Sequence, residues 1–229
     1  MQGYFRFPTI NKSNLVFVCE DDLWIADINK PTARRLTANF GNISSPLISE
    51  DGKTIAYIGQ EDGNTEIFTM SINGGQSQRI TFEGGQIANI AAWNKNTIYY
   101  SSSLDSPFGR TFDLRSVSIS GGESSALNYG MIKDISFNSN NIVLGKNTAD
   151  LARWKRYKGG TAGKLLINKS GSNKEFNYLI NLDGNISSPM YISDRIYFTS
   201  DHEGIGNIYS CLKSGKGLKK HTNHNEYYV

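Results

Sequence analysis

Residues 153–158 place four basic side chains and two aromatic rings within six consecutive positions. These residues are Arg153, Trp154, Lys155, Arg156, Tyr157 and Lys158. Cations interleaved with aromatic rings are how proteins grip single-stranded nucleic acid, and the same chemistry suits an acidic peptide, a carboxyl end or a neighbouring domain. The alternative is a long loop between two strands whose rings pack while its charges stay solvated.

Histidine is the next residue type that could do chemistry, and all three copies fall in the last 28 residues. A serine, histidine and acid can form a triad in any sequence order. However, the chain has no Gly-x-Ser-x-Gly nucleophile elbow. In the repeat described below, His202 takes the position of Glu61 and His221 that of Ile80. We therefore interpret the histidines, His224 included, as structural and expect no catalytic residue in this chain.

The acidic triplet Glu20, Asp21 and Asp22 could hold Ca²⁺, which prefers several oxygen ligands. It lies between two expected strands, where a tight turn with exposed acids is typical, and it lacks the alternating acids and central glycine of a calcium loop. Cys19 and Cys211 cannot form a disulfide framework, and no zinc-ligand spacing occurs. We therefore expect no metal site.

The sequence Lys-Gly-Gly-Thr-Ala-Gly-Lys at 158–164 resembles a phosphate-binding loop. Its spacing fails, because Gly159 and Gly163 enclose three residues instead of four. Leu165 also stands where a serine or threonine would bind magnesium. We expect no nucleotide or other cofactor.

Charge and hydropathy exclude further classes of protein. The chain carries 24 Lys and Arg against 21 Asp and Glu, and the net charge of +3 is too small to imply nucleic-acid binding by itself. No apolar run approaches the roughly 18 residues that a membrane span needs. The start contains Arg6 and Pro8 without the apolar stretch of a signal peptide. We expect a cytoplasmic protein that binds neither nucleic acid nor membrane.

Composition and periodicity predict an all-β protein. Gly, Asn and Ser favour turns over helix interiors, and together they make up 71 of the 229 residues. Short runs rich in Ile, Val, Tyr and Phe alternate with polar residues, as half-buried strands do. The clearest runs are 14–18, 54–58, 66–70, 96–100 and 195–199.

The strands recur in a repeated unit. Residues 43–81 and 186–222 carry the same marks in the same order, beginning with Ile-Ser-Ser-Pro and closing on a threonine. The closing positions are Thr37, Thr81, Leu127, Ile180 and Thr222. Their intervals of 44, 46, 53 and 42 residues lie near the roughly 40–45 of a four-stranded propeller blade.

We therefore predict a single β-propeller domain, 1–229, built of four-stranded antiparallel blades. The blades fall at about 3–38, 39–82, 83–128, 129–181 and 182–223, and 224–229 begins a sixth. Such an end would leave a strand edge exposed, so we expect the front portion of a longer polypeptide. A complete five-bladed protein is the alternative.

Several stretches resemble known propellers. Residues 49–53, 67–75 and 79–81 resemble the TolB-type repeat, which specifies a fold more than an activity. Phe-Val-Cys-Glu-Asp-Asp-Leu-Trp at 17–24 is similar to the opening blade of the tricorn protease family, and 145–164 is similar to that family's fourth blade. Residues 187–228 resemble its fifth blade running into the sixth.

The tricorn resemblance implies the amino-terminal six-bladed propeller of a large, oligomeric, cytoplasmic serine peptidase that shortens oligopeptides. The propeller would act as a non-catalytic channel, gate and assembly module, because the family's catalytic residues lie beyond position 229. Its partners would be a downstream propeller, PDZ-like and peptidase domains of the same chain, peptides in transit and further copies of the chain. A free-standing TolB-like protein-binding propeller is the alternative.

Two consequences follow for the site residues. Since the resembling family keeps 153–158 without binding nucleic acid, we interpret that segment as a packing, interdomain or peptide contact. The family also anchors a substrate's carboxyl end with a basic pair after the second blade, whereas residues 82–90 of this chain contain no Lys or Arg. Any anchoring must therefore use other residues.

Overall fold

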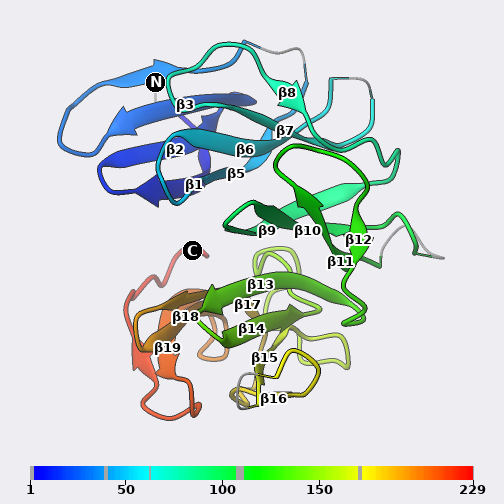
Figure 1. Ribbon diagram of the computed structural model, residues 1–229. Helices are drawn as coiled ribbons and strands as arrows, with labels where there is room; N and C mark the ends of the chain where they lie inside the picture. Colours follow the sequence, from blue (N-terminus) through cyan, green and yellow to red (C-terminus); the bar gives the residue numbers. More distant parts are fainter. Residues whose placement is uncertain (1–2, 39–40, 62, 107–110, 170–171, 229) are drawn as a thin grey trace. The chain divides into compact units, whose positions relative to one another are not determined.

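The computed structural model describes residues 3–38, 41–61, 63–106, 111–169 and 172–228. Within these ranges every regular element is a β-strand, and the strands form five antiparallel sheets of four. The chain divides into a first body, Met1–Asn128, with three sheets and a second body, Tyr129–Val229, with two (Figure 1). The predicted all-β class and its five four-stranded blades are thereby confirmed.

The first body contains three blades. Blade one comprises β1 (Phe5–Asn11), β2 (Asn14–Cys19), β3 (Asp22–Asp27) and β4 (Ala33–Arg35). Blade two comprises β5 (Ser44–Ile48), β6 (Thr54–Gly59), β7 (Glu66–Ser71) and β8 (Gln78–Arg79). Blade three comprises β9 (Ile87–Asn94), β10 (Thr97–Ser102), β11 (Asp113–Ser118) and β12 (Ser125–Ala126).

The second body contains two blades. Blade four comprises β13 (Ile132–Asn138), β14 (Asn141–Lys146), β15 (Lys164–Asn168) and β16 (Phe176–Tyr178). Blade five comprises β17 (Ile186–Ile192), β18 (Arg195–Ser200), β19 (Asn207–Leu212) and β20 (Lys219–Lys220). The described residues after Lys220 form no strand, so a sixth blade beginning at 224 stays a prediction.

In every blade the strands pair in chain order, so the first and the fourth are edge strands. Prolines follow this rule, because proline has no N–H to donate to a second neighbour. Pro8, Pro46 and Pro189 all lie in first strands, where the pairing register shifts in a bulge. The residue before each proline, Phe7, Ser45 or Ser188, has a positive φ of about 50°.

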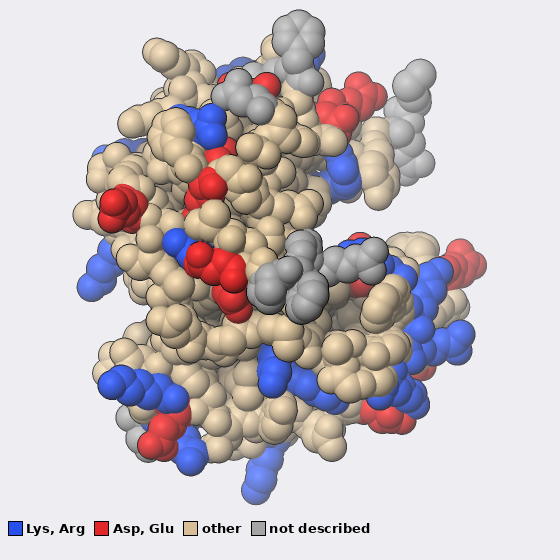
Figure 2. All heavy atoms as spheres, turned by 90° about the vertical axis from the view of Figure 1, so that its right-hand side faces the viewer, with Lys and Arg blue, Asp and Glu red and all other residues tan. Residues whose placement is uncertain are grey.

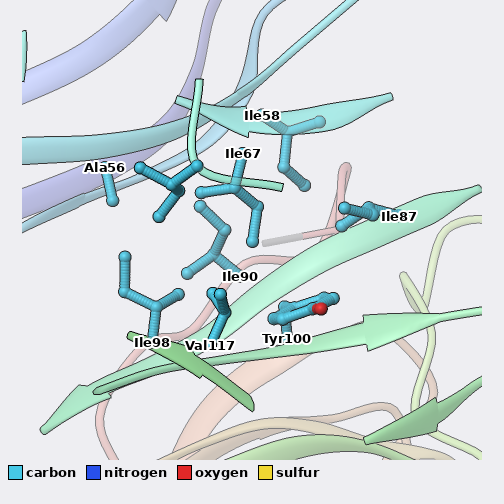
Figure 3. Close-up of a cluster of buried hydrophobic side chains, with 9 residues drawn as sticks. Ala56, Ile58, Ile67, Ile87, Ile90, Ile98, Tyr100 and Val117 are labelled. Atoms are coloured by element: carbon cyan, nitrogen blue, oxygen red, sulfur yellow. The ribbon is translucent and has the colours of Figure 1, made fainter. Parts of the chain in front are cut away.

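The blades of the first body stack through apolar side chains. One cluster joins blade one to blade two and includes Val16, Leu23, Ile55 and Tyr57. A second joins blade two to blade three, where Ile58 and Ile67 face Ile90, Ile98 and Val117 (Figure 3). Each sheet is therefore buried by its neighbour, which is why a single repeat cannot be stable alone.

The second body repeats this arrangement. Val143 and Leu165 of blade four pack with Ile196, Phe198 and Tyr209 of blade five. Truncation of such a buried side chain costs about 2–5 kcal/mol, so each interface contributes substantially to folding.

The repeat's closing threonine ties the third strand of a blade to the fourth. The Thr37, Thr81 and Thr222 hydroxyls accept the amides of Leu23, Ile67 and Ile208 at 2.8–2.9 Å. Each hydroxyl then donates to a buried side chain that opens the third strand. Thr37 donates to Asp22, Thr81 to Glu66 and Thr222 to Asn207.

Blade three differs from the predicted repeat count by one residue. The amide that precedes each closing position donates to the third strand, as Ile80 does to the Ile67 carbonyl. In blade three that donor is Leu127, bonded to the Leu114 carbonyl, so the closing position is Asn128. The sequence predicts Leu127 as the closing position, one residue too early, because Asn128 stands where the other blades have the marker threonine.

Candidate functional site

The long connection between β14 and β15 is held in place by its backbone. The Arg156 amide donates to Asp201 Oδ2 at 2.7 Å, and the Trp154 carbonyl accepts from Asn185 Nδ2 at 3.1 Å. Leu151 near its start and Ala162 near its end are buried. The predicted contact residues 153–158, which we call the basic-aromatic loop, therefore lie on a fixed backbone.

The side chains of this loop point outward. Residues 153–156 are exposed, and the Trp154 side chain is 60% exposed. The Trp154 and Tyr157 rings lie 5.1 Å apart, and Lys155 Nζ lies 5.3 Å from the Tyr228 ring. Lys158 forms an ion pair with Asp183. The structure thus brings all six predicted residues into one surface.

Asp201 is the residue that fixes this loop, and the sequence reading missed it. Its carboxylate is 1% exposed and accepts the Asn185 amide on Oδ1 at 2.8 Å, besides the Arg156 amide on Oδ2. It stands 45 positions from Arg156 in the sequence, and no local pattern marks the contact.

A cavity of about 720 Å³ opens beside the loop within the second body. Lys155 and Arg156 line one part of it, together with Glu203, Lys220 and the chain end at 223–228. The chain end is tied down, because the Tyr228 hydroxyl donates to the Gly204 carbonyl and the His224 amide to Asn207 Oδ1. The lining mixes cations, carboxylates, amides and tyrosine rings.

Two of the histidines lie beside serines. His221 Nε2 is 2.7 Å from Ser210 Oγ, and His202 Nδ1 is 3.0 Å from Ser200 Oγ. Both serine residues are fully buried, and Ser210 Oγ also accepts from Arg195 Nε at 2.8 Å. Burial lowers the pKa of His202, so the ring is neutral at pH 7. A substrate could not reach these hydroxyls: the Ser210–His221 pair links β19 to the residue after β20, and the Ser200–His202 pair lies within the turn that follows β18.

Glu20 and Asp21 form the two-residue turn between β2 and β3, both with positive φ, and Asp22, the third acid of the triplet, begins β3. Asp21 forms an ion pair with Arg6 at 2.7 Å. Asp22 serves the closing threonine of blade one and pairs with Arg35. These acids therefore have structural roles.

Packing requires two of the three glycines in the stretch 158–164. A Cβ on Gly163 would lie 2.2 Å from the Ile186 carbonyl oxygen, and one on Gly159 would meet the Tyr157 hydroxyl. Lys164 Nζ donates to the Leu182 carbonyl at 3.2 Å. These contacts account for its resemblance to a phosphate-binding loop.

The connection 82–90 of the first body, which lacks Lys and Arg, supplies a buried acid instead. Glu83 accepts from Arg115 Nε at 3.1 Å, from Ser102 and Ser124 at 2.7 Å, and from the Tyr100 hydroxyl. Burial and the hydrogen bond to Glu83 raise the pKa of Tyr100. This network links the connection to blade three and uses the Arg115 charge within the fold.

None of the described residues belongs to a helix long and apolar enough to cross a membrane. Sheets of four antiparallel strands that stack face to face in series are the blades of a β-propeller. That is the class of protein the fold defines.

The comparisons with known proteins identify the family. The chain matches the model of the tricorn protease N-terminal beta propeller domain over residues 2–229 and therefore belongs to that family. The crystal structure of the tricorn protease superposes with a TM-score of 0.91 at 30% identity, covering 100% of this chain and 23% of that one. A TolB structure from Agrobacterium tumefaciens gives a TM-score of 0.74 at 14% identity over 96% of this chain and 81% of that one, which shows the fold alone.

The chain spans about a fifth of the length of the first curated relatives that it matches. It is 33% identical to the tricorn protease homolog of Saccharolobus solfataricus over 100% of this chain and 22% of that protein. Two Sulfurisphaera tokodaii proteins also match this chain. One, named as the N-terminal subunit of a tricorn-like protease, is 30% identical over 76% of this chain and 90% of its own length. The other, named as the C-terminal subunit, is 60% identical over 53 residues, 23% of this chain and 6% of its own length.

Proposed function

We propose that this chain is the non-catalytic propeller part of a tricorn-type peptidase and that it acts as a channel wall and assembly module. The observation that carries the proposal is the family match over residues 2–229, joined to relatives of which the chain spans about a fifth. The peptidase chemistry would come from another part of the same enzyme, and oligopeptides would be its substrates.

The surface of the blades supports a role in assembly. On β1 the side chains of Phe5, Phe7 and Ile10 are 64%, 44% and 58% exposed. Met190 and Ile192 on β17 are likewise about half exposed. Apolar side chains gathered on an edge strand are typical of a surface that another element covers. We propose that further blades of the enzyme cover them.

The names of the Sulfurisphaera relatives suggest two forms for the partner. A tricorn-like protease is named there as two subunits, and this chain matches both of them. The peptidase part could thus follow in the same polypeptide or be a separate one. In either form we propose a cytoplasmic enzyme that contains several copies of this propeller.

Reconstitution tests the proposal. The 229-residue chain is mixed with the remainder of the Saccharolobus solfataricus homolog, meaning that protein without the stretch this chain matches. We expect co-elution in size-exclusion chromatography with light scattering, and faster hydrolysis of a fluorogenic peptide than with the remainder alone. The chain by itself should hydrolyse nothing.

Two results would contradict the proposal. One is peptide hydrolysis by the chain alone that survives further purification. The other is a remainder that assembles and hydrolyses peptides identically with and without the chain.

A further inference from the structure

Charge is divided unequally between the two bodies. The second body carries 14 Lys and Arg against 8 Asp and Glu, a net charge of +6, whereas the first carries 10 against 13, a net charge of −3. Lys and Arg side chains gather along one side of the second body (Figure 2). The modest net charge of the whole chain therefore hides a strongly basic surface, which attracts acidic ligands.

Within that body the basic-aromatic loop holds three cations that form no ion pair with a described acid, although Lys155 Nζ lies 5.3 Å from the Tyr228 ring. Among the residues that the structure describes, no Asp or Glu oxygen lies within 4.0 Å of the charged groups of Arg153, Lys155 or Arg156. Asp201 and Asn185 hold the loop through its backbone instead. The side chains are consequently available to a ligand.

The backbone of the basic-aromatic loop is strained at Arg156. Arg156 has a φ of 56°, in the left-handed region that a residue with a side chain rarely adopts. The amide of this residue donates to the buried Asp201 carboxylate, which maintains the strained conformation. Such strain gathers at binding sites, where it keeps side chains in position before a ligand arrives.

The surroundings favour a polypeptide over a nucleic acid. The adjoining cavity of about 720 Å³ is lined by Lys155, Arg156 and Lys220, but also by Glu203 and Glu226. A peptide main chain has N–H donors that the Glu226 carboxylate and the neighbouring asparagine side chains of the lining can accept, whereas a phosphodiester backbone has no N–H donor.

We propose that the basic-aromatic loop binds acidic segments of the peptides that the enzyme processes, with Arg153, Lys155 and Arg156 pairing carboxylates and Trp154 supplying an apolar contact. The proposal rests on the proposed function for the source of these peptides. It adds the substrate feature, an Asp- or Glu-rich segment, and the residues that recognise it.

Fluorescence anisotropy on the 229-residue chain tests this assignment. The probe is a fluorescein-labelled peptide of about ten residues rich in Glu, compared with Lys-rich and uncharged peptides of the same length. We expect binding of the Glu-rich peptide alone, and weaker binding as NaCl is raised. The double variant Arg153→Gln/Lys155→Gln should weaken binding about tenfold.

The matched control is Lys213→Gln/Lys216→Gln, two exposed lysines of the same body whose loss changes the net charge equally. This variant should bind within about twofold of the parent chain. Equal urea midpoints for the three proteins would show that both variants fold.

Three results would overturn the proposal. The Glu-rich peptide could fail to bind, or the control could lose as much affinity as the loop variant, which would assign binding to the overall charge. A single-stranded oligonucleotide of similar length could displace the peptide at a lower concentration, which would assign the loop to nucleic acid. Each result is separable from reconstitution of peptidase activity, because anisotropy needs no peptidase part.

Discussion

The Thr81 hydroxyl donates a hydrogen bond of 2.5 Å to the Glu66 carboxylate and accepts one of 2.8 Å from the Ile67 amide. A single hydroxyl therefore satisfies two polar groups where the third and fourth strands of blade two meet. Glu66 is 1% exposed and also pairs with Arg79 at 2.9 Å. The same arrangement in blades one and five explains why threonine marks the end of the repeat.

Replacement of Thr81 by Val should destabilise the chain by about 1–3 kcal/mol, because valine keeps the shape and leaves the Ile67 amide and one Glu66 oxygen without this partner. Urea unfolding followed by tryptophan fluorescence measures the loss. Thr32→Val is the control, since Thr32 is exposed and should be nearly neutral. Equal midpoints for the two variants would contradict this role of Thr81.

Glu66 should make stability depend on pH in the acid range. Burial alone would raise the pKa of Glu66, but hydrogen bonds from Thr81, from the amides of Gly84 and Glu83, and from Arg79 hold it below the usual 4.5. An acid with a lowered folded-state pKa adds stability above its unfolded pKa and loses it as pH falls through the folded value. The stability contributed by Glu66 should therefore be complete at pH 7 and decline below about pH 4.5.

The measurement is the urea midpoint of the parent chain and of Glu66→Gln at pH 7 and pH 3. The difference between the two proteins should be large at pH 7 and smaller at pH 3, because the unfolded parent chain binds a proton at this carboxyl below about pH 4.5 more readily than the folded chain does. A difference that does not change with pH would show that the pKa of Glu66 is the same in the folded and unfolded chain and that the carboxylate contributes no charge-dependent stability.

The Glu83–Arg115 pair should be strongly coupled. Their side chains are only 5% and 10% exposed, so removal of either partner leaves the other charge buried and should cost about 3–5 kcal/mol. Because both single losses include that same penalty, the double variant Glu83→Ala/Arg115→Ala should cost much less than their sum. Asp105→Asn is the control: its side chain is 61% exposed, and its loss should cost under about 1 kcal/mol. Additive single losses would contradict the coupling.

How far the sequence predicts this molecule depends on the range of each interaction. The run 54–58 predicted a strand because its side chains suit one, although β6 is buried on both faces: Ile55 and Tyr57 pack with blade one, and Ala56 and Ile58 pack with blade three. The closing positions Thr37, Thr81 and Thr222 predicted the blade ends from a mark that is also local in the sequence. In blade three the predicted closing position was wrong by one residue, because Asn128 is not the threonine that marks this position in the other blades.

The site could be predicted only in part. The composition of 153–158 marked the loop, but not the backbone that presents it. Asp201 accepts a hydrogen bond from the Arg156 amide, 45 positions earlier in the chain, and Glu83 pairs with Arg115, 32 positions later. Such contacts depend on which segments the fold brings together, and any exposed Asp or Glu would look the same in the sequence.

Two glycines in the connection between β14 and β15 form a matched pair for testing how that connection is held. A Cβ on Gly163 would lie 2.2 Å from the Ile186 carbonyl oxygen, a backbone atom that cannot turn aside, whereas one on Gly160 would meet nothing within 4 Å. Gly163→Ala must therefore push the connection away from blade five and break the bond from the Ile186 amide to the Gly163 carbonyl. We expect the free energy of unfolding to fall by about 1–3 kcal/mol from overpacking. Hydrogen exchange at the Arg156 amide should become faster, because its hydrogen bond to Asp201 is weakened.

The control is Gly160→Ala, three positions away in the same connection, which should leave both the urea midpoint and that exchange rate close to those of the parent chain. If the two alanine variants behave alike, the connection is not fixed against blade five as the structure has it, and the preorganisation of Arg153 and Lys155 for an acidic peptide fails with it.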